Sequence, residues 1–271
     1  MRIVIMGPAG KMGRLVVKEA LKRRRDFMIV GGVVPYDRPY IRQDIGKATG
    51  DGFVGATIYD ELEFCIPIAE GVIDFTTPEC TMETVKKCVE YMRPLVIGTT
   101  GFDEMDRKRI EYAATKIPIL LAANTSKAVN LVYKMSEMAA RTLGDAADVE
   151  IIDMHDNGKA DSPSGTAKEI GQIIAAVKEK DLEEIADYGR TGKREEGHIG
   201  FHSVRAGDIS STHTVVFGLN GERLEITHRA YDWSTYAKGA LDGMLFLKGK
   251  KPGLYTFADV LEEINGKKSE E

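Results

Sequence analysis

The sequence has few of the residues that mark disulfide-stapled, metal-bound or membrane-embedded chains. Its three cysteines, Cys65, Cys80 and Cys88, are odd in number and follow no CxxC or Cys/His ligand spacing, which argues against a disulfide framework and a zinc site. No window reaches the apolar length of a membrane span, and the chain starts with the strand-like MRIVIM rather than a secretory leader. These absences predict a cytoplasmic protein without a metal.

An excess of positive charge is also missing. The 271 residues carry a net charge of -5, and the isoelectric point is near 5.7, so there is no electrostatic footprint for nucleic acid or an anionic membrane. The basic run Lys22-Arg23-Arg24-Arg25 is interpreted as the solvated end of a helix. The chain is long enough for two domains, each with its own core.

The first half of the chain alternates short apolar runs with segments of helical spacing. We expect strands at residues 3–6, 28–34, 71–75, 94–98 and 117–122, and helices at 11–22, 79–91 and 103–115. Repeated strand and helix segments joined by short loops are typical of an α/β fold with a parallel sheet covered on both faces. The first half is therefore predicted to be Rossmann-like.

The pattern changes after Ala123. A helix is expected at 128–143, a strand at 148–154, a helix at 164–179 and a last helix at 235–247. Residues 198–228 alternate with period two and are interrupted by the turn signals Gly207-Asp208 and Asn220-Gly221, which predicts antiparallel sheet. The second half is therefore expected to have a different architecture.

A glycine-rich turn, GPAGKMGR, joins the first expected strand to the first helix. Glycine allows the backbone to approach a dinucleotide pyrophosphate closely, and the helix N-terminus favours the anion. The form is G-x-x-G-x-x-G rather than G-x-G-x-x-G, so a plain turn with a close helix contact is the alternative.

The residue that ends the second strand normally selects the cofactor, because an acidic side chain there binds the ribose hydroxyls of NAD. Here that position is Pro35. Asp37 is close enough along the chain to reach a ribose, and Arg38 offers a cation for the 2′-phosphate of NADP. NADPH and NADH both stay open, and Arg38 favours NADPH.

One of the five histidines, His155, precedes Lys159 by four residues, and Pro-Ser-Gly-Thr follows. A histidine can donate a proton near neutral pH, and a lysine beside a helix N-terminus can hold a carboxylate. The alternative is a loop histidine, a solvated lysine and an N-cap. The remaining histidines, in contrast, are interpreted as sheet-face or interface residues: His198, His202, His213 and His228.

These motifs, in this order, resemble the dihydrodipicolinate reductase family. The resemblance extends from the first strand to the last helix, and a set of this length is specific where one member alone is not. It rests on the following segments: GPAGKMG (7–13), IDFTTPE (73–79), VIGTTGF (96–102), AAN (122–124), EII (150–152), His155 with Lys159, DSPSGTA (161–167), GFHSVRAGDI (200–209) and GERLEITHRA (221–230).

The resemblance implies a dinucleotide-binding domain of residues 1–126 and 234–271, and a substrate-binding and oligomerisation domain of residues 127–233. The second domain would be α+β, with an open, largely antiparallel or mixed sheet that builds a homotetramer. The activity implied is NADPH- or NADH-dependent reduction of dihydrodipicolinate (4-hydroxy-tetrahydrodipicolinate) to tetrahydrodipicolinate in the diaminopimelate pathway to lysine.

The resemblance also implies roles for individual residues. His155 would be the acid and Lys159 its cationic partner, with the amides of Gly165 and Thr166 on a substrate carboxylate. The wider substrate-binding set adds Asp156, Ser164 and Trp233. The cofactor would be held by Gly7, Pro8, Ala9, Gly10, Lys11, Met12, Asp37, Arg38, Gly98, Thr99, Thr100, Ala122, Ala123, Asn124 and Thr125.

Several departures from the family pattern gather near the expected substrate pocket. Asp156 replaces the second histidine of His-His-x-x-Lys, and Asp232-Trp233 replaces Ser-Arg. Where the family has asparagine, phenylalanine, serine and then a glycine before Val-Asn, this chain has Asn124-Thr125-Ser126-Lys127-Ala128. A dicarboxylate would meet Asp156 as a like charge, whereas a cationic imine would meet a partner. Three alternatives therefore stay open: reduction of another cyclic imine, a different Rossmann dehydrogenase of an amino or hydroxy acid, and a catalytically silent nucleotide-binding regulator.

Overall fold

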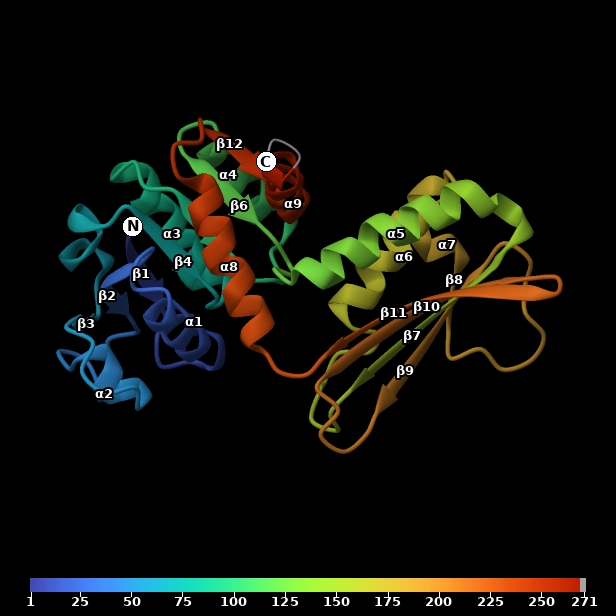
Figure 1. Ribbon diagram of the computed structural model, residues 1–271, viewed down its shortest axis with the longest axis horizontal. Helices are drawn as coiled ribbons and strands as arrows, with labels where there is room; N and C mark the ends of the chain where they lie inside the picture. The colour runs from blue at the N-terminus through green and yellow to red at the C-terminus, as the bar shows by residue number, and fades with distance from the viewer. Residues whose placement is uncertain (269–271) are drawn as a thin grey trace. The chain divides into compact units, whose positions relative to one another are not determined.

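A computed structural model describes residues 1–268 of the protein (Figure 1). The chain forms two compact units, Met1–Ser126 with the chain from Ser234 onward, and Lys127–Trp233. No helix within residues 1–268 combines the length and apolar character needed to cross a bilayer.

The first unit is built on a seven-stranded sheet in the order β12-β6-β5-β4-β1-β2-β3. Each neighbouring pair is parallel, which confirms the Rossmann-like α/β fold. The direction of strand order reverses between β1 and β4, so a crevice is expected there at the carboxyl ends of the strands. The strands are β1 (Arg2–Met6), β2 (Met28–Val33), β3 (Ile58–Tyr59), β4 (Gly71–Asp74), β5 (Leu95–Ile97), β6 (Pro118–Leu121) and β12 (Gly253–Tyr255).

Helices cover both faces of this sheet. One layer contains α1 (Lys11–Lys22), α8 (Ser234–Leu247) and α9 (Phe257–Lys268), and the other contains α3 (Pro78–Glu90) and α4 (Glu104–Ala114). Successive residues of β1 are buried because each face of the strand meets a helix layer. Shorter elements complete the unit: α2 (Ile45–Thr49) and the 3-10 turns η1 (Leu62–Phe64) and η2 (Ile66–Ile68).

The second unit has a five-stranded mixed sheet in the order β11-β10-β7-β9-β8. Strand β10 is antiparallel to β7 and β11, whereas β9 is parallel to β7 and β8. The expectation of antiparallel pairing throughout residues 198–228 was therefore wrong for β9, because β7 lies between β9 and β10. The strands are β7 (Asp148–His155), β8 (Ala186–Tyr188), β9 (Ile199–Arg205), β10 (Ser211–Leu219) and β11 (Glu222–Ala230).

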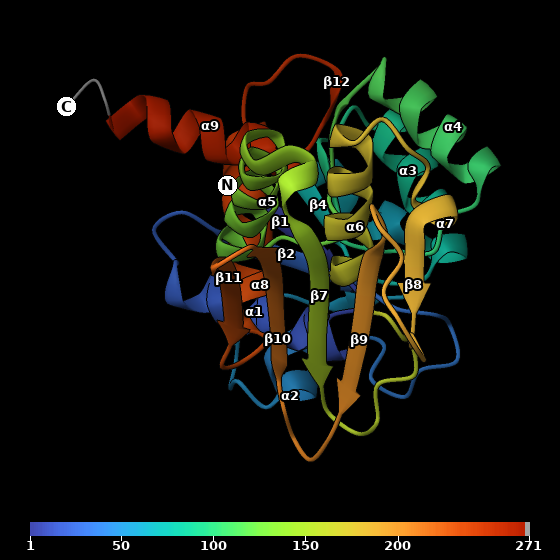
Figure 2. The same ribbon diagram turned by 90° about the vertical axis from the view of Figure 1, so that its right-hand side faces the viewer.

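One face of this second sheet packs against helices, and the opposite face carries no helix among the described residues of the unit (Figures 1 and 2). The covering elements are α5 (Lys127–Leu143), the 3-10 turn η3 (Gly144–Ala146), α6 (Gly165–Val177) and α7 (Leu182–Ile185). Side chains alternate between the two faces of a strand, so Val149, Ile151, Val215 and Phe217 all point into the helix-covered core.

The helix-covered face changes character along the strands. On β7 the inward positions are Val149 and Ile151, then Asp153 and His155, all buried. On β10 the inward His213 lies opposite Asp153 in the antiparallel register. The apolar core therefore ends in a buried polar layer at the carboxyl end of β7.

Candidate active site

The first unit has a cavity of about 430 Å³ at the carboxyl ends of its central strands. Met6 and Gly7 end β1, Val33 to Pro35 end β2, and Thr76 follows β4, and all of them line it. Open α/β sheets bind dinucleotides at this edge, where the strand order reverses. The cavity therefore lies at the sheet edge where a nucleotide is expected, and Gly7 is the predicted cofactor residue that lines it.

The glycine turn forms one wall of this edge. Gly7 has a φ of 61°, the left-handed region that favours glycine, and the Gly10 amide donates to the Gly7 carbonyl at 2.9 Å. Gly13 packs so closely on the turn that an added Cβ would overlap the Gly7 carbonyl and lie 2.8 Å from Pro8 Cα. Helix α1 begins without an acidic residue in its first turn, which suits a pyrophosphate.

The other predicted cofactor residues lie in the loops after β5 and β6, at the same edge of the sheet. Gly98 packs on the ring of Phe75, and Thr99 is buried and accepts a hydrogen bond from Thr81 at 2.9 Å. Thr125 is also buried and donates to the Tyr236 carbonyl at 2.7 Å, so its hydroxyl anchors this loop to α8. Thr100 and Ala123 are exposed, Ala122 is buried, and Asn124 accepts from the Ser126 amide.

Asp37 and Arg38 are not among the residues that line the cavity, although Pro35 is. Both are exposed and lie 3.5 Å apart as an ion pair. The cavity is instead rimmed by carboxylates, with one lysine, Lys87, among its lining residues. The ammonium of Lys87 already binds Glu63 at 2.6 Å and Glu90 at 3.1 Å.

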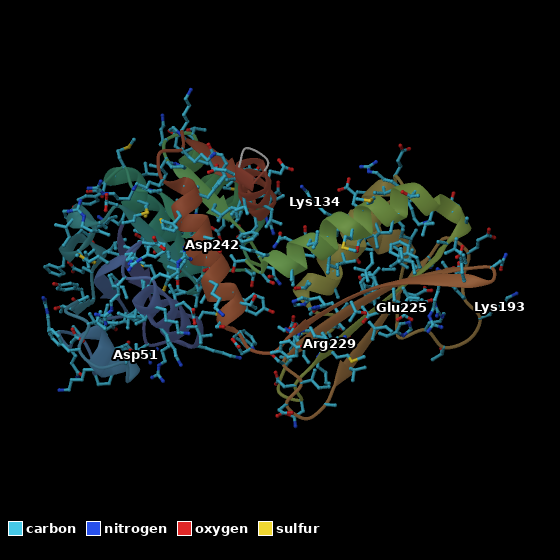
Figure 3. All side chains as sticks on the ribbon, in the orientation of Figure 1. Asp51, Lys134, Lys193, Glu225, Arg229 and Asp242 are labelled. Carbon is cyan, nitrogen blue, oxygen red and sulfur yellow. The ribbon has the colours of Figure 1, made fainter. Side chains whose placement is uncertain are left out.

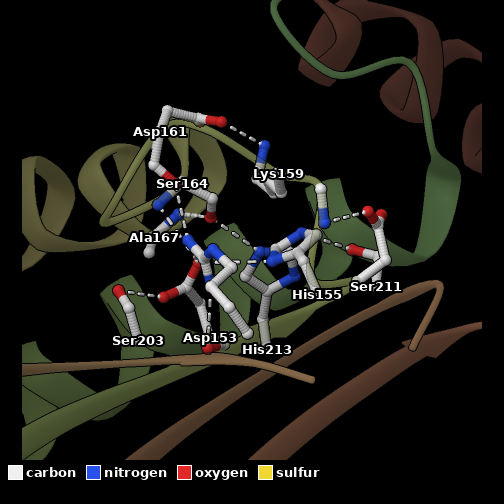
Figure 4. Close-up of polar contacts among 12 residues, drawn as sticks. Asp153, His155, Lys159, Asp161, Ser164, Ala167, Ser203, Ser211 and His213 are labelled. Atoms are coloured by element: carbon white, nitrogen blue, oxygen red, sulfur yellow. Dashed lines mark hydrogen bonds and ion pairs between the residues drawn. The ribbon is translucent and has the colours of Figure 1, made fainter. Parts of the chain in front are cut away.

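In the second unit, the buried polar layer is organised around Asp153 (Figure 4). One carboxylate oxygen, Oδ1, accepts from Ser203 Oγ at 2.6 Å. The other, Oδ2, accepts from the Ser164 amide and from Arg205 Nη2, both at 3.1 Å. Burial alone would raise the pKa of Asp153, but the contact with His155, the hydrogen bonds from Ser203 and the Ser164 amide, and the charge of Arg205 lower it well below its usual range.

His155 lies next to this carboxylate and is only 6% exposed. Its Nδ1 is 3.3 Å from Asp153 Oδ2 and lacks good hydrogen-bond alignment, so the contact is chiefly electrostatic. Its Nε2 is 3.1 Å from Ser211 Oγ. The imidazole is thus held between an anion and a hydroxyl.

His213 packs edge-on against His155, with 5.2 Å between the ring centroids. Its Nε2 lies 3.0 Å from Ser164 Oγ, and its buried Nδ1 has no hydrogen-bond partner. Burial, assisted by the charge of His155, lowers the pKa of His213 to about 3, although Asp153 opposes the shift. His213 is therefore a neutral imidazole near neutral pH.

This neutral histidine predicts an acid-sensitive fold. In the unfolded chain the His213 imidazole takes up a proton near 6.5, but in the native state only near 3, so the free energy of unfolding falls as pH drops through this window. The expected loss is on the order of a few kcal/mol. Urea denaturation at about pH 7 and about pH 5 measures it, and His213→Gln should flatten the dependence. Equal slopes for wild type and variant would contradict the prediction.

The loop after β7 carries the remaining predicted residues. Lys159 binds Asp161 at 2.6 Å, and Asp156 accepts from the Gly158 amide at 2.9 Å, closing a local turn. Ser164 is the N-cap of α6, because its Oγ accepts from the Ala167 amide at 3.2 Å. Gly165 and Thr166 supply the first-turn amides of α6 on this side, and Trp233 is the last residue of the unit.

Asp153, His155 and His213 also present three possible metal donors within 4.8 Å of one another. Arg205 bears directly on this question, because its guanidinium binds the same carboxylate oxygen of Asp153 that faces His155. A cation there would meet that positive charge. Arg205 therefore occupies the side of Asp153 where such a cation would bind.

Sequence reasoning identified His155 but not its buried partners. The sequence pattern predicts only a strand position for Asp153 and a sheet-face position for His213, and it indicates no role for Arg205, Ser203 or Ser211. A signal was available: Asp153 and His155 share the period-two face of Val149 and Ile151, and His213 shares the face of Val215 and Phe217. A polar residue on an otherwise buried face needs partners.

The Rossmann-like fold of the first unit, together with the family matches that follow, identifies a pyridine-nucleotide-dependent oxidoreductase. The chain matches the family models described as dihydrodipicolinate reductase, N-terminus, over residues 1–125 and dihydrodipicolinate reductase, C-terminus, over residues 128–261. The chain belongs to the dihydrodipicolinate reductase family, as the sequence motifs predicted.

Named relatives agree with this assignment. The 4-hydroxy-tetrahydrodipicolinate reductase of Pseudomonas fluorescens is 42% identical over 264 residues, covering 96% of this chain and 98% of that protein. The reductase of the same name from Alkalilimnicola ehrlichii is 43% identical over 266 residues, again covering 96% and 98%. The family assignment therefore applies to nearly the whole chain.

Solved structures show the same fold. The dipicolinate-bound dihydrodipicolinate reductase from Paenisporosarcina sp. TG-14 has a TM-score of 0.74 at 25% identity, covering 94% of this chain and 97% of that chain. The amine dehydrogenase from Mycobacterium smegmatis, at 14% identity and a TM-score of 0.61, covers 95% of both chains. The second likeness shows the fold alone.

Proposed function

We propose that this protein reduces dihydrodipicolinate (4-hydroxy-tetrahydrodipicolinate) to tetrahydrodipicolinate in the diaminopimelate pathway to lysine, in the cytoplasm. The observation that carries the proposal is the buried His155, held beside the Asp153 carboxylate at the end of β7. The names of the relatives support the substrate. The three unpaired cysteines suit a reducing compartment.

The residues of the second unit are suited to bind and protonate a small acid. The N-terminus of α6, with the amides of Gly165 and Thr166, attracts a substrate carboxylate. Lys159 adds a positive charge, and its ammonium forms an ion pair with Asp161. His155 donates the proton to the substrate atom that becomes electron-rich during reduction.

The residues of the first unit are suited to a pyridine nucleotide, which supplies the hydride when bound. Gly13 lets α1 pack directly against the backbone of the glycine turn, because any side chain there would overlap the Gly7 carbonyl. The proposed cofactor residues at this edge comprise Gly7 to Met12 together with the loops at 98–100 and 122–125.

Asp156 need not exclude a dicarboxylate substrate. Its Oδ1 accepts from the Gly158 amide, so the carboxylate helps to shape the loop. Part of its charge is thereby offset by a backbone donor, which reduces repulsion of an anion. Dihydrodipicolinate therefore stays compatible with Asp156 in the loop.

The charge of the nucleotide cavity supports NADH as the preferred cofactor. The cavity is lined by Asp60, Glu61, Glu63, Glu79 and Glu83, whereas its lysine, Lys87, is engaged by Glu63 and Glu90. A 2′-phosphate would bring additional negative charge to this rim. The exposed Arg38 is already paired with Asp37, which weakens the case for NADPH.

The uncovered face of the second sheet is the proposed surface for a homotetramer. Val204 is exposed there, and Ile152, Met154 and Val216 share that face and are half-buried. Glu225 and Arg229 of β11 are exposed on the same face (both labelled in Figure 3). A sheet face with aliphatic side chains and no covering helix is suited to pack against a second copy. Sedimentation velocity of the purified chain is expected to give a tetramer, and a monomer would remove this part of the proposal.

Initial rates of nucleotide oxidation with freshly generated dihydrodipicolinate test the function. We expect rapid turnover, with KM for NADPH about tenfold above that for NADH, which corresponds to about 1.4 kcal/mol. Glu79→Gln/Glu83→Gln should narrow this gap, whereas Glu104→Gln, on the surface of α4 and away from the cavity, should not.

Other outcomes of this assay are equally informative. If dihydrodipicolinate is turned over negligibly but another cyclic imine is reduced at a clear rate, the proposed substrate is wrong and the proposed reduction of an imine stands. A lower KM for NADPH than for NADH would overturn the cofactor preference alone.

A further inference from the structure

We propose that Asp153 is a positioning residue that holds the charge and orientation of His155 for proton transfer, an inference that rests on the role proposed above for His155. The two residues occupy positions i and i+2 of β7, so both side chains point to the helix-covered face. Their contact is 3.3 Å, and both are buried. Strand β7 therefore places the proton donor, His155, beside its counter-ion, Asp153.

Asp153 is itself immobilised. Ser203 and the Ser164 amide, from β9 and from the N-cap of α6, donate to its two oxygens. Arg205 binds Oδ2 and also donates to the Asp161 carbonyl at 2.7 Å, which fastens the loop after β7 to the same carboxylate. Contacts from a second strand and a helix leave the carboxylate little freedom to turn, so its position beside His155 is set by the fold.

Burial makes the counter-ion necessary. A proton donor must first carry its proton, and a buried imidazolium is costly without a nearby anion. The charged groups around His155 are Asp153 on β7, Arg205 on β9, and the Lys159–Asp161 pair in the loop. His213 on β10 is neutral, and burial also lowers the pKa of His228 on β11. Asp153 is the anion in direct contact with the imidazole ring.

The proton balance follows from this arrangement. The bond between a ring nitrogen of His155 and its proton breaks, the proton passes to the reduced substrate, and neutral imidazole remains. Asp153 stays ionised throughout, because its pKa lies well below the usual range. It therefore acts only through His155.

The decisive experiment is the pH dependence of kcat for Asp153→Asn, measured with dihydrodipicolinate and NADH. Removing the anion should lower kcat by about tenfold or more and move the basic limb of the profile to lower pH by about one unit, with KM for NADH unchanged. Asp153→Glu keeps the negative charge, so the basic limb of its kcat profile should lie at the wild-type pH. Nitrogen NMR shifts of the His155 ring should report a smaller charged fraction in Asp153→Asn.

Glu150→Gln is the matched control. Glu150 lies three positions earlier on β7, points to the opposite face, and binds His202 at 2.5 Å and Arg190 at 2.8 Å. It is therefore the same kind of carboxylate, histidine and arginine cluster without His155. Because Glu150 lies on the face proposed for the tetramer, sedimentation velocity must first show that the variant assembles as wild type does. The variant should then leave the basic limb in place, which separates a loss of charge beside His155 from a general loss of stability.

The outcomes separate this inference from the function on which it rests. If His155→Ala destroys turnover but Asp153→Asn keeps both the wild-type limb and the His155 ring shifts, the positioning role is wrong and the acid assignment stands. If Asp153→Asn and Glu150→Gln move the limb equally, the inference also fails. If His155→Ala turns over normally, the proposed acid itself is wrong.

Discussion

Replacing His155 by alanine is expected to lower kcat for dihydrodipicolinate by about 10²–10⁴-fold, the contribution typical of a positioned general acid. The reduced substrate would then have to take its proton from water, in a layer where the native imidazole is only 6% exposed. The KM for NADH should change little, since the glycine turn lies in the other unit. Steady-state rates at several pH values measure the effect.

His202→Ala is the matched control for this variant. His202 lies on the neighbouring strand β9, and it binds Glu150, whose side chain points to the opposite face of the sheet. Its loss should leave kcat within about twofold of wild type, as expected for a side chain outside a catalytic site. Equal losses in both variants would assign the effect to folding rather than to proton transfer.

Gly13→Ala should cause the largest change in nucleotide binding. The new Cβ would overlap the Gly7 carbonyl and lie 2.7 Å from Gly7 C and 2.8 Å from Pro8 Cα, all backbone atoms that no rotamer change can move. The turn must therefore separate from α1, which displaces the amides that would face the pyrophosphate. We expect KM for NADH to rise at least tenfold and stability to fall by about 1–3 kcal/mol.

Gly218→Ala separates this local effect from the general cost of adding a methyl group. An added Cβ at Gly218, in β10, would meet nothing nearer than the Asp148 carbonyl oxygen at 3.9 Å. Its KM for NADH should equal that of wild type in the same titration. If Gly13→Ala also binds NADH normally, the glycine turn is not the nucleotide cradle.

The sequence predicts best those elements whose signal is local. Helix α1 spans Lys11–Lys22, as its apolar spacing predicted, because one face packs on the sheet and the chain leaves a glycine turn. The short strand β12 and helix α9 were not anticipated. Strand β12 has only three residues, Gly253–Tyr255, which is too short for a recognisable pattern. Its position depends on pairing with β6, which lies far away in the chain.

Pairing between distant segments explains the error at β9. The turn signal at Gly207-Asp208 correctly marks the end of one strand and the approach to the next, but it does not say which strands become neighbours. Strand β7 enters between them because its inward Val149 and Ile151 complete the apolar core on both sides. Burial of that strand outweighs the local tendency to form a hairpin.

In the candidate site, too, some residues are recognisable from local motifs, whereas others come together only through pairing of distant strands. His155, Lys159 and the glycine turn are recognisable from short motifs, and their roles stay predictions. The spacing of Asp37 and Arg38 from β2 does not predict that they pair with each other, nor that neither is among the residues that line the cavity. Asp153 and His213 become partners of His155 only through the register of β7 and β10.

Because side chains alternate along β7, the strand register that buries Val149 and Ile151 also sets the positions of Asp153 and His155. A shift of one residue in the pairing of this strand would send Glu150, Ile152 and Met154 inward and turn Val149, Ile151, Asp153 and His155 to the open face. A chain with that misalignment would lose its apolar packing before it could be tested for activity. The position of the imidazole therefore depends on the same strand register that forms the apolar core, whereas Lys159 lies in the loop that follows the strand.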